Sequence, residues 1–276
     1  MKSIDNATIK DLARKLQIRP SSILGQNFLV DEDVLKKIIK TADIKKGDKI
    51  LEIGPGLGIL TRALLQAGAS VLAIERDKKL VKYLQDHFSD YPDLRILEKD
   101  ILKISNKEIF NLLGGKFRVV SNIPYQITGK IIKKFVSSEL PKPESAILLV
   151  QKEVAQRVCA QKGKMSMLAL SVQAYAKPEI SIDVPKTAFW PVPKVDSSLL
   201  RINGIKERIE PNIDEKRFWQ IARIGFSSPR KQLKNNLSCG LRIDQAEVSR
   251  ALSECRISDM ARAQELGVED WISFVI

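Results

Sequence analysis

Residues 49–58, which read KILEIGPGLG, constrain the fold of this chain more than any other stretch. The first half is an apolar run of buried-strand length, and the second half places Gly54, Gly56 and Gly58 before an apolar pattern of helical period. Glycine suits a sharp strand-to-helix turn because it adopts positive φ and lets a ligand approach the backbone closely. The stretch therefore predicts a strand, a turn and a helix, with a turn suited to a nucleotide-type cofactor.

The spacing of the glycines indicates which cofactor class fits. A dinucleotide fingerprint reads Gly-x-Gly-x-x-Gly, and here the third glycine, Gly58, comes one residue early, so the match to NAD is poor. Glu52, two residues before Gly54, and the Gly-x-Gly-x-Gly rhythm instead resemble the loop of class I S-adenosylmethionine methyltransferases. A glycine turn that binds nothing is the alternative.

Two later apolar runs end at acidic residues. Residues 70–75 (SVLAIE) end in Glu75, about twenty residues beyond the glycine turn, where a carboxylate can accept the hydroxyls of a ribose. Residues 94–97 precede Asp100, which can accept from an adenine amino group or can simply close a turn. Strands that alternate with helices at this spacing predict an α/β fold with a parallel, doubly wound sheet and a ligand above its carboxyl ends.

The next strand, residues 117–122, runs directly into Asn122, Ile123, Pro124 and Tyr125. The Asn122 side-chain oxygen and the Ile123 carbonyl can each accept a hydrogen of a flat amine such as N6 of adenine, which favours a tetrahedral nitrogen in the transition state. Pro124 would fix the turn, and Tyr125 would offer a face for a flipped base, worth about 1 to 3 kcal/mol. By itself such a string is more often a plain turn.

Composition narrows the remaining classes. The chain has 276 residues, enough for one α/β domain plus a smaller one, and a formal net charge of +13 that favours a nucleic acid over a membrane as partner. One histidine, His87, and three widely spaced cysteines predict neither a metal site nor a catalytic triad. Without a long apolar run or a leader-like N-terminus, we expect a cytoplasmic enzyme with no membrane segment.

The predicted domains are an N-terminal arm (residues 1–20), a methyltransferase domain (21–204) and an α-helical domain (205–276). Within the second, residues 172–184 suggest an antiparallel pair of strands. The helical domain gathers several cations, and we predict that four of them bind RNA phosphates, with a solvated helix face as the alternative. These four residues are Arg223, Arg230, Lys231 and Lys234.

Ordered motifs over most of the chain resemble one family. They lie at residues 25–29, 52–58, 75, 100, 122–125, 151–155, 189–197 and 261–271. From about residue 20 to its end the chain resembles the ribosomal RNA adenine dimethyltransferases, and among them the bacterial enzymes that act on 16S ribosomal RNA. Two features are weaker than is usual in that family: residues 229–231 carry one basic residue fewer, and Ser21 and Ser22 stand where lysines are common.

The resemblance implies a Rossmann-like class I methyltransferase domain with a small α-helical C-terminal domain, and it assigns roles to individual residues. Phe189 would pack opposite Tyr125 and complete a catalytic set with Asn122, Ile123 and Pro124. S-adenosylmethionine would contact Gln26, Asn27, Leu29, Gly54, Gly56, Glu75, Asp100 and Asn122. The substrate would be two adjacent adenosines in the 3′-terminal hairpin of 16S ribosomal RNA, dimethylated by a monomer during assembly of the small subunit.

Two other functions stay open on the sequence alone. A 23S ribosomal RNA adenine methyltransferase of the macrolide-resistance type shares the cofactor loop and the Asn-Ile-Pro-Tyr string, but residues 151–153 and 261–271 favour the small-subunit enzyme. A non-catalytic RNA-binding assembly factor is the alternative of another class. The intact Gly54, Gly56, Glu75, Asn122 and Tyr125 argue against it.

Overall fold

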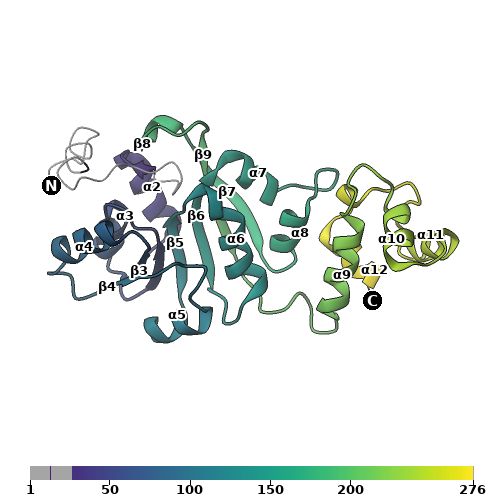
Figure 1. The fold of residues 1–276 in the computed structure, drawn as a ribbon, viewed down its shortest axis with the longest axis horizontal. Helices are drawn as coiled ribbons and strands as arrows, with labels where there is room; N and C mark the ends of the chain where they lie inside the picture. Colours follow the sequence, from purple (N-terminus) through teal and green to yellow (C-terminus); the bar gives the residue numbers. More distant parts are fainter. Residues whose placement is uncertain (1–12, 14–26, 276) are drawn as a thin grey trace. The chain divides into compact units, whose positions relative to one another are not determined.

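A computed structural model describes residue 13 and residues 27–275 of the chain. Apart from residue 13, the predicted N-terminal arm lies outside the described residues, and so does Gln26. The described chain forms two compact units (Figure 1): one holds the residues up to Ala155 together with Pro178–Ile205, and the other holds Gln156–Lys177 and Lys206 onwards. The segment Gln156–Lys177, which the sequence grouped with the first domain, thus belongs to the compact unit of the C-terminal helices.

The first unit is built on a seven-stranded sheet of order β4-β3-β2-β5-β6-β9-β7. Neighbouring strands from β4 to β6 are parallel, and β9 runs antiparallel to β6. The strands are β2 (Lys49–Ile53), β3 (Ser70–Glu75), β4 (Leu94–Glu98), β5 (Arg118–Asn122), β6 (Ser145–Gln151), β7 (Lys177–Val184) and β9 (Ser197–Asn203). From β2 the sheet grows in one direction through β3 and β4 and in the other through β5 and β6. Ligands of open α/β sheets bind where the strand order reverses in this way, here between β2 and β5.

Helices and short turns connect these strands. The helices of the first unit are α2 (Glu32–Ala42), α3 (Ile59–Gln66), α4 (Lys78–His87), α5 (Asn106–Leu113) and α6 (Thr128–Ile132), and α7 (Lys152–Val158) starts in it. The shorter elements are η1 (Tyr125–Ile127), the π-helical η2 (Lys133–Ser138) and η3 (Lys186–Ala188). The two-residue strands β1 (Phe28–Leu29) and β8 (Phe189–Trp190) pair with one another in a separate sheet.

Alternating strand residues form the main hydrophobic core. Ile50, Val71 and Ile147 are each less than 3% exposed and pack in one cluster with Ile38 of α2 and Leu64 of α3. Their neighbours along the strands point to the other face, where α5 contacts β2 and β3. A sheet covered on both faces explains why its strands read as continuous apolar runs.

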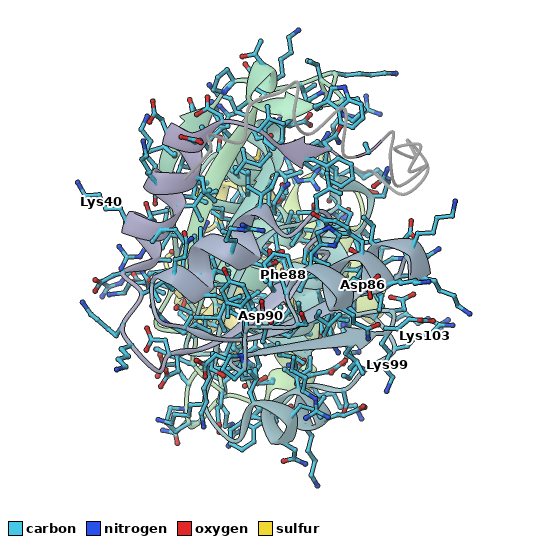
Figure 2. The ribbon with its side chains drawn as sticks, turned by 90° about the vertical axis from the view of Figure 1, so that its left-hand side faces the viewer. Lys40, Asp86, Phe88, Asp90, Lys99 and Lys103 are labelled. Carbon is cyan, nitrogen blue, oxygen red and sulfur yellow. The ribbon has the colours of Figure 1, made fainter. Side chains whose placement is uncertain are left out.

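Phe88, at the end of α4, packs against Gly58 at the start of α3. Figure 2 shows Phe88 within the unit while Lys40 and Lys103 extend outward from it. A Cβ added to Gly58 would lie 2.6 Å from the Phe88 ring. Gly58 also has φ +74°, so both conformation and space require glycine at the position immediately before α3.

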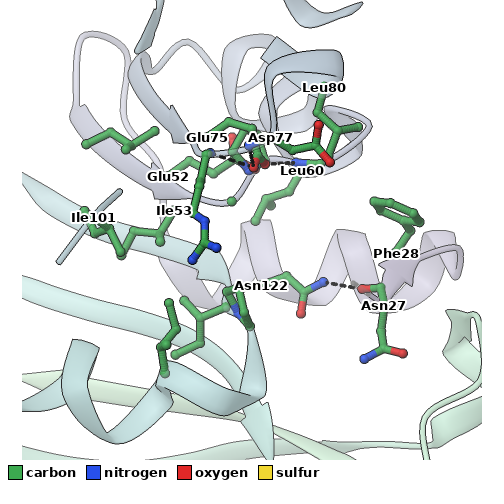
Figure 3. Close-up of a pocket in the computed structure, with 18 of the residues that line it drawn as sticks. Asn27, Phe28, Glu52, Ile53, Leu60, Glu75, Asp77, Leu80, Ile101 and Asn122 are labelled. Atoms are coloured by element: carbon green, nitrogen blue, oxygen red, sulfur yellow. Dashed lines mark hydrogen bonds between the residues drawn. The ribbon is translucent and has the colours of Figure 1, made fainter. Parts of the chain in front are cut away.

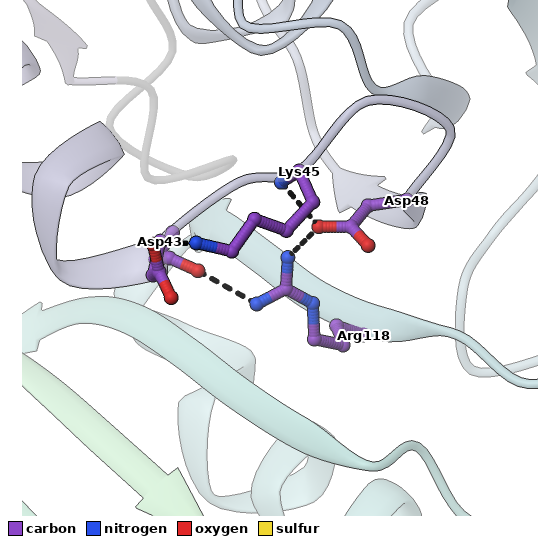
Figure 4. Close-up of polar contacts among 5 residues, drawn as sticks. Asp43, Lys45, Asp48 and Arg118 are labelled. Carbon is purple, nitrogen blue, oxygen red and sulfur yellow. Dashed lines mark hydrogen bonds and ion pairs between the residues drawn. The ribbon is translucent and has the colours of Figure 1, made fainter.

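At the amino ends of the central strands β2 and β5, Arg118 and Asp48 form a largely buried ion pair (Figure 4). Arg118 also donates to the Ala42 carbonyl at 2.6 Å, and Asp48 accepts from the main-chain N–H of Lys45 at 2.6 Å. The end of α2 is thereby tied to the starts of β2 and β5, strands whose other ends carry the cavity described below.

The second unit is mostly helical. It contains α8 (Met167–Gln173), α9 (Glu215–Gly225), α10 (Leu233–Leu241), α11 (Gln245–Glu254), η4 (Ala263–Glu265) and α12 (Val268–Val275). Inside it the Tyr175 hydroxyl donates to Glu215 at 2.6 Å and accepts from the Trp219 indole at 3.2 Å. Among the described residues, no helix is both long and apolar enough to cross a membrane.

The expected pair of strands over residues 172–184 is wrong in its first half. Residues Met167–Gln173 form α8, and only Lys177–Val184 form a strand. Ser166 caps α8 by accepting from the main-chain N–H of Ala169 at 3.2 Å, and the run MLAL that follows is made of strong helix formers. The predicted strands therefore began too early in the sequence, within the end of α8.

Candidate functional site

A cavity of about 220 Å³ opens at the carboxyl ends of β2, β3 and β5 in the first unit (Figure 3). It lies at the reversal of strand order, as the doubly wound sheet predicts. Its wall includes residues from β1, the glycine turn and the segment after β5. Predicted site residues in this wall are Asn27, Leu29, Gly54, Gly56, Glu75, Asp100, Asn122, Ile123, Pro124 and Tyr125.

The glycine turn forms the floor of the cavity between β2 and α3. Gly54 has φ +64° and its main-chain N–H donates to the Ile74 carbonyl at 2.9 Å, which fixes the turn to β3. Gly56 has φ +59°, and a Cβ there would lie 2.9 Å from the Phe28 ring. The turn is therefore closed on one side by an aromatic ring and must be glycine at this position.

Glu75 places a buried carboxylate at the end of β3. Its Oε1 accepts from the main-chain N–H groups of Arg76 at 2.7 Å and Asp77 at 2.9 Å, and its Oε2 accepts from Gly56 at 3.3 Å. Burial raises the pKa of this carboxyl, and the backbone donors partly offset that rise. The carboxylate is thus oriented before any ligand arrives, and it joins the tip of β3 to the glycine turn.

Glu52 is a second buried acid in the cavity wall, and its position in the sequence did not by itself predict a ligand for it. It is 2% exposed, and the Thr61 hydroxyl donates to its Oε2 at 2.6 Å. Burial, together with the nearby Glu75, raises the pKa of Glu52 to about 8. The sequence feature that could have predicted a role for Glu52 is an acidic residue inside an otherwise apolar strand. A carboxyl group is buried only where a hydrogen-bond partner or a cationic ligand offsets the free-energy cost of removing it from water.

Asp100 and the residues after it line the side of the cavity next to β4. The Asp100 carboxylate accepts from the main-chain N–H of Leu102 at 2.9 Å, so one of its oxygens closes the local turn. Ile101 is 4% exposed and presents an apolar surface beside it. The side chain therefore combines the turn role with a position in the cavity wall.

Asn122 connects the end of β5 to the chain before β1. Its Nδ2 donates to the main-chain carbonyl of Asn27 at 3.1 Å, which Figure 3 shows as a dashed line. Because that acceptor requires a donor, the amide nitrogen is directed to Asn27 and Oδ1 is the remaining acceptor of the amide. Asn27 and Leu29 thus reach the cavity from a segment nearly a hundred residues away.

Tyr125 is held at the rim of the cavity by its hydroxyl, which lies 2.7 Å from Oγ of Ser197 at the start of β9. Burial raises the pKa of this phenol. Pro124 precedes it, and the Pro124 carbonyl accepts from the Thr128 hydroxyl at 3.3 Å. The hydrogen bonds fix the ring and the turn together and leave the ring as part of the cavity wall.

Phe189 is not brought to the cavity with Tyr125. It is 0% exposed, pairs with Leu29 across β1 and β8, and belongs to the main core with Ala188. The next residue, Trp190, stacks on Phe28 with ring centroids 6.3 Å apart. A stacking role for Phe189 opposite Tyr125 stays a prediction that this arrangement does not support.

The predicted RNA-binding cations of the second unit differ in their surroundings. Arg223, Arg230 and Lys231 are exposed. Lys234 instead forms an ion pair with Asp259, which also accepts from the Ser249 hydroxyl at 2.5 Å. Three of the four predicted contacts therefore face solvent, and the fourth ties α10 to the chain after α11. In the part of the chain that the structure describes, no group of three or more potential ligands is placed to hold a metal ion.

A known protein family and several named proteins match nearly the whole chain. A family model described as "Ribosomal RNA adenine dimethylase" matches residues 17–276. A protein of Dehalococcoides mccartyi named ribosomal RNA small subunit methyltransferase A is 39% identical over 267 residues, 96% of this chain and 90% of that protein. A protein of Nostoc sp. with the same name is 38% identical, over 92% of this chain and 96% of its own length.

Two solved structures of adenine or ribosomal RNA methyltransferases are also similar to this chain. The crystal structure of the 23S rRNA methyltransferase ErmE superposes with a TM-score of 0.73 at 27% identity, over 90% of this chain and 98% of that one. A dimethyladenosine transferase from Plasmodium falciparum gives a TM-score of 0.75 at 26% identity, over 90% and 95% of the two chains. The similarity therefore extends over both units.

Proposed function

This chain belongs to the ribosomal RNA adenine dimethylase family, and on that premise we propose that it dimethylates N6 of two adjacent adenosines in the 3′-terminal hairpin of 16S ribosomal RNA. It is an S-adenosylmethionine-dependent methyltransferase that acts on adenine in ribosomal RNA. The observation that carries the proposal is the hydrogen bond from Asn122 to Asn27, because it orients the amide as an acceptor in the cavity.

The cavity wall fits S-adenosylmethionine in charge and in shape. The cofactor is a cation with an adenosine group, and the cavity contains two buried carboxyl groups, Glu52 and Glu75, as well as apolar side chains such as Ile101. Gly54, whose φ of +64° favours glycine, leaves the floor without a side chain between the backbone and a ligand. Glu75 would hold the ribose, Asp100 the adenine amino group and Glu52 the cationic end.

Bound there, the cofactor supplies an electrophilic methyl group on a sulfonium that leaves as a neutral thioether. The protein's part is to make N6 of the target adenine a better nucleophile. Oδ1 of Asn122 and the carbonyl of Ile123 accept the two N6 hydrogens and favour the tetrahedral nitrogen, since preorganised acceptors stabilise charge that develops in the transition state. Tyr125 offers its ring face to the extruded base.

The 16S RNA of an assembling small subunit is our proposed substrate. The curated relatives that are 34–39% identical are named for the small subunit, whereas the structure named for 23S RNA is 27% identical. The exposed Arg223, Arg230 and Lys231 give the second unit a surface suited to RNA phosphates. We also propose that the enzyme acts in the cytoplasm as a monomer, with a sedimentation mass near 31.0 kDa.

The substrate proposal is tested by transfer of a labelled methyl group from S-adenosylmethionine. Three substrates are compared: small subunits that lack N6,N6-dimethyladenosine, small subunits that carry it, and large-subunit RNA. We expect label only in the first. Label in large-subunit RNA would instead indicate the macrolide-resistance type of enzyme, and RNA binding without label would indicate a non-catalytic assembly factor.

A further inference from the structure

A short loop beside Tyr125 exposes two apolar side chains. Val192 is 56% exposed and Val195 is 45% exposed, and both belong to residues 191–196, which we call the valine loop. Large hydrophobic side chains this exposed are uncommon in the described chain, where only Leu140, Ile180, Ile243 and Met260 join them. Two on one six-residue loop next to a substrate cavity suggest a contact surface.

The loop is anchored at both ends against residues that line the cavity. Before it, Trp190 stacks on Phe28, a cavity residue, and pairs with it across β1 and β8. After it, Ser197 is hydrogen-bonded to the hydroxyl of Tyr125, another cavity residue. The loop therefore runs along the rim between the two aromatic residues.

Further contacts make the base of the loop rigid and leave its tip exposed. Asp196 accepts from the main-chain N–H of Lys186 at 2.9 Å through Oδ1, and from that of Lys152 at 3.0 Å through its own carbonyl. Pro191 and Pro193 each fix a φ angle within the loop. A preorganised loop loses little conformational freedom when it binds.

We propose that Val192 and Val195 stack against the RNA base next to the adenosine that enters the cavity. A base leaving a stack exposes the face of its neighbour, and proteins that distort nucleic acids cover such faces with apolar side chains. The exposed Lys194 lies between the two valines, which suits a polyanionic partner. This inference rests on the proposed function, because it concerns RNA at the same site.

The test uses the full-length protein and small subunits that lack N6,N6-dimethyladenosine. We expect Val192→Thr/Val195→Thr, which keeps side-chain shape but adds hydroxyls, to lower kcat/KM about tenfold through KM. The melting temperature and the affinity for S-adenosylmethionine should not change. Val192→Ile/Val195→Ile should retain kcat/KM, and Ile180→Thr, a matched change of an exposed residue on β7, should have no effect.

Three results would overturn the inference: an unchanged kcat/KM in the threonine double variant, a loss confined to kcat, or a loss of cofactor affinity. The first would mean that the valines do not contact RNA, the second that they act on a step after RNA binding, and the third that they act on the cofactor site. A wild-type protein that transfers no methyl group to these subunits would count against the proposed function instead, so the two failures are distinguishable.

Discussion

Asn122 at the end of β5 donates to the main-chain carbonyl of Asn27 at 3.1 Å, and this bond joins two segments that both line the cavity. The amide nitrogen of this cavity-lining residue therefore holds the chain before β1 in place, and its oxygen is the remaining acceptor of the amide. Asn122→Ala removes both functions, while the exposed cations of the second unit are unaffected.

We expect Asn122→Ala to lower methyl transfer about 10²- to 10³-fold, the usual loss when one preorganised polar group is removed from a transition state. Binding of small subunits should stay within about twofold of the wild type, since the variant keeps the basic surface. Single-turnover transfer and filter binding measure the two quantities separately. A variant that loses both equally would contradict the assigned role.

Tyr125 has two separable properties, its ring and its hydroxyl, and substitution can distinguish them. Tyr125→Phe keeps the stacking face but removes the hydrogen bond to Ser197, so we expect a loss of about three- to tenfold in kcat/KM. Tyr125→Ala also removes the ring and should cost about tenfold more. Ser197→Ala should match Tyr125→Phe if the hydroxyl acts only to position the ring.

Gly56 and Gly47 form a matched pair for testing the cofactor loop. Both have positive φ, but a Cβ at Gly56 would meet the Phe28 ring at 2.9 Å, whereas nothing lies within 4 Å of a Cβ at Gly47. Gly47→Ala should cost about 1 to 2 kcal/mol of stability and leave cofactor affinity unchanged. Gly56→Ala should in addition weaken S-adenosylmethionine at least tenfold in calorimetric titration. Equal affinities in the two variants would argue against a cofactor role for the turn.

Glu52 should make stability depend on pH. Its pKa is raised from 4.5 to about 8 in the folded state, so between these values the folded protein binds a proton that the unfolded chain has released. The contribution of Glu52 to stability is therefore present below about pH 4.5 and is lost as pH rises toward 8. Urea unfolding midpoints should fall over this window, and less steeply in Glu52→Gln, which keeps an acceptor for Thr61. Identical slopes in both proteins would show that Glu52 titrates normally.

Lys231 and Lys234 lie three residues apart and should respond differently to the loss of charge. Lys231 is exposed, so Lys231→Gln should reduce by about one the slope of log affinity for small-subunit RNA against log salt. Lys234 is paired with Asp259, so Lys234→Gln should lower the melting temperature and leave the salt slope nearly unchanged. A reduced salt slope with an unchanged melting temperature in Lys234→Gln would instead indicate that Lys234 binds RNA.

The parallel sheet could be predicted because its signals are local. The apolar runs of β2, β3 and β5, the glycine turn and the polar residues at the strand ends can each be recognised directly in the sequence. Asn122 and Glu75 were expected at one edge of the sheet for the same reason, and both line the cavity.

The remaining features depend on contacts between distant segments. Phe189 is buried in the core because β8 pairs with β1. Nothing within residues 189–197 indicates that β1, some 160 residues earlier, is the pairing strand. Lys234 meets Asp259 across 25 positions, so its neighbourhood in sequence predicts only a cation on a helix. The predicted strand pair over residues 172–184 began too early, at the end of helix α8, because helix and strand are hard to separate in short apolar runs.

The most direct test of the central claim identifies the product by mass. Small subunits that lack the modification are incubated with the protein and S-adenosylmethionine, and their RNA is digested to nucleosides. We expect N6,N6-dimethyladenosine, at up to two residues per subunit, from the wild type, and about 10²- to 10³-fold slower formation of it by Asn122→Ala. A methylated pyrimidine or guanosine, or adenosine methylated on a ring nitrogen, would contradict the proposed chemistry.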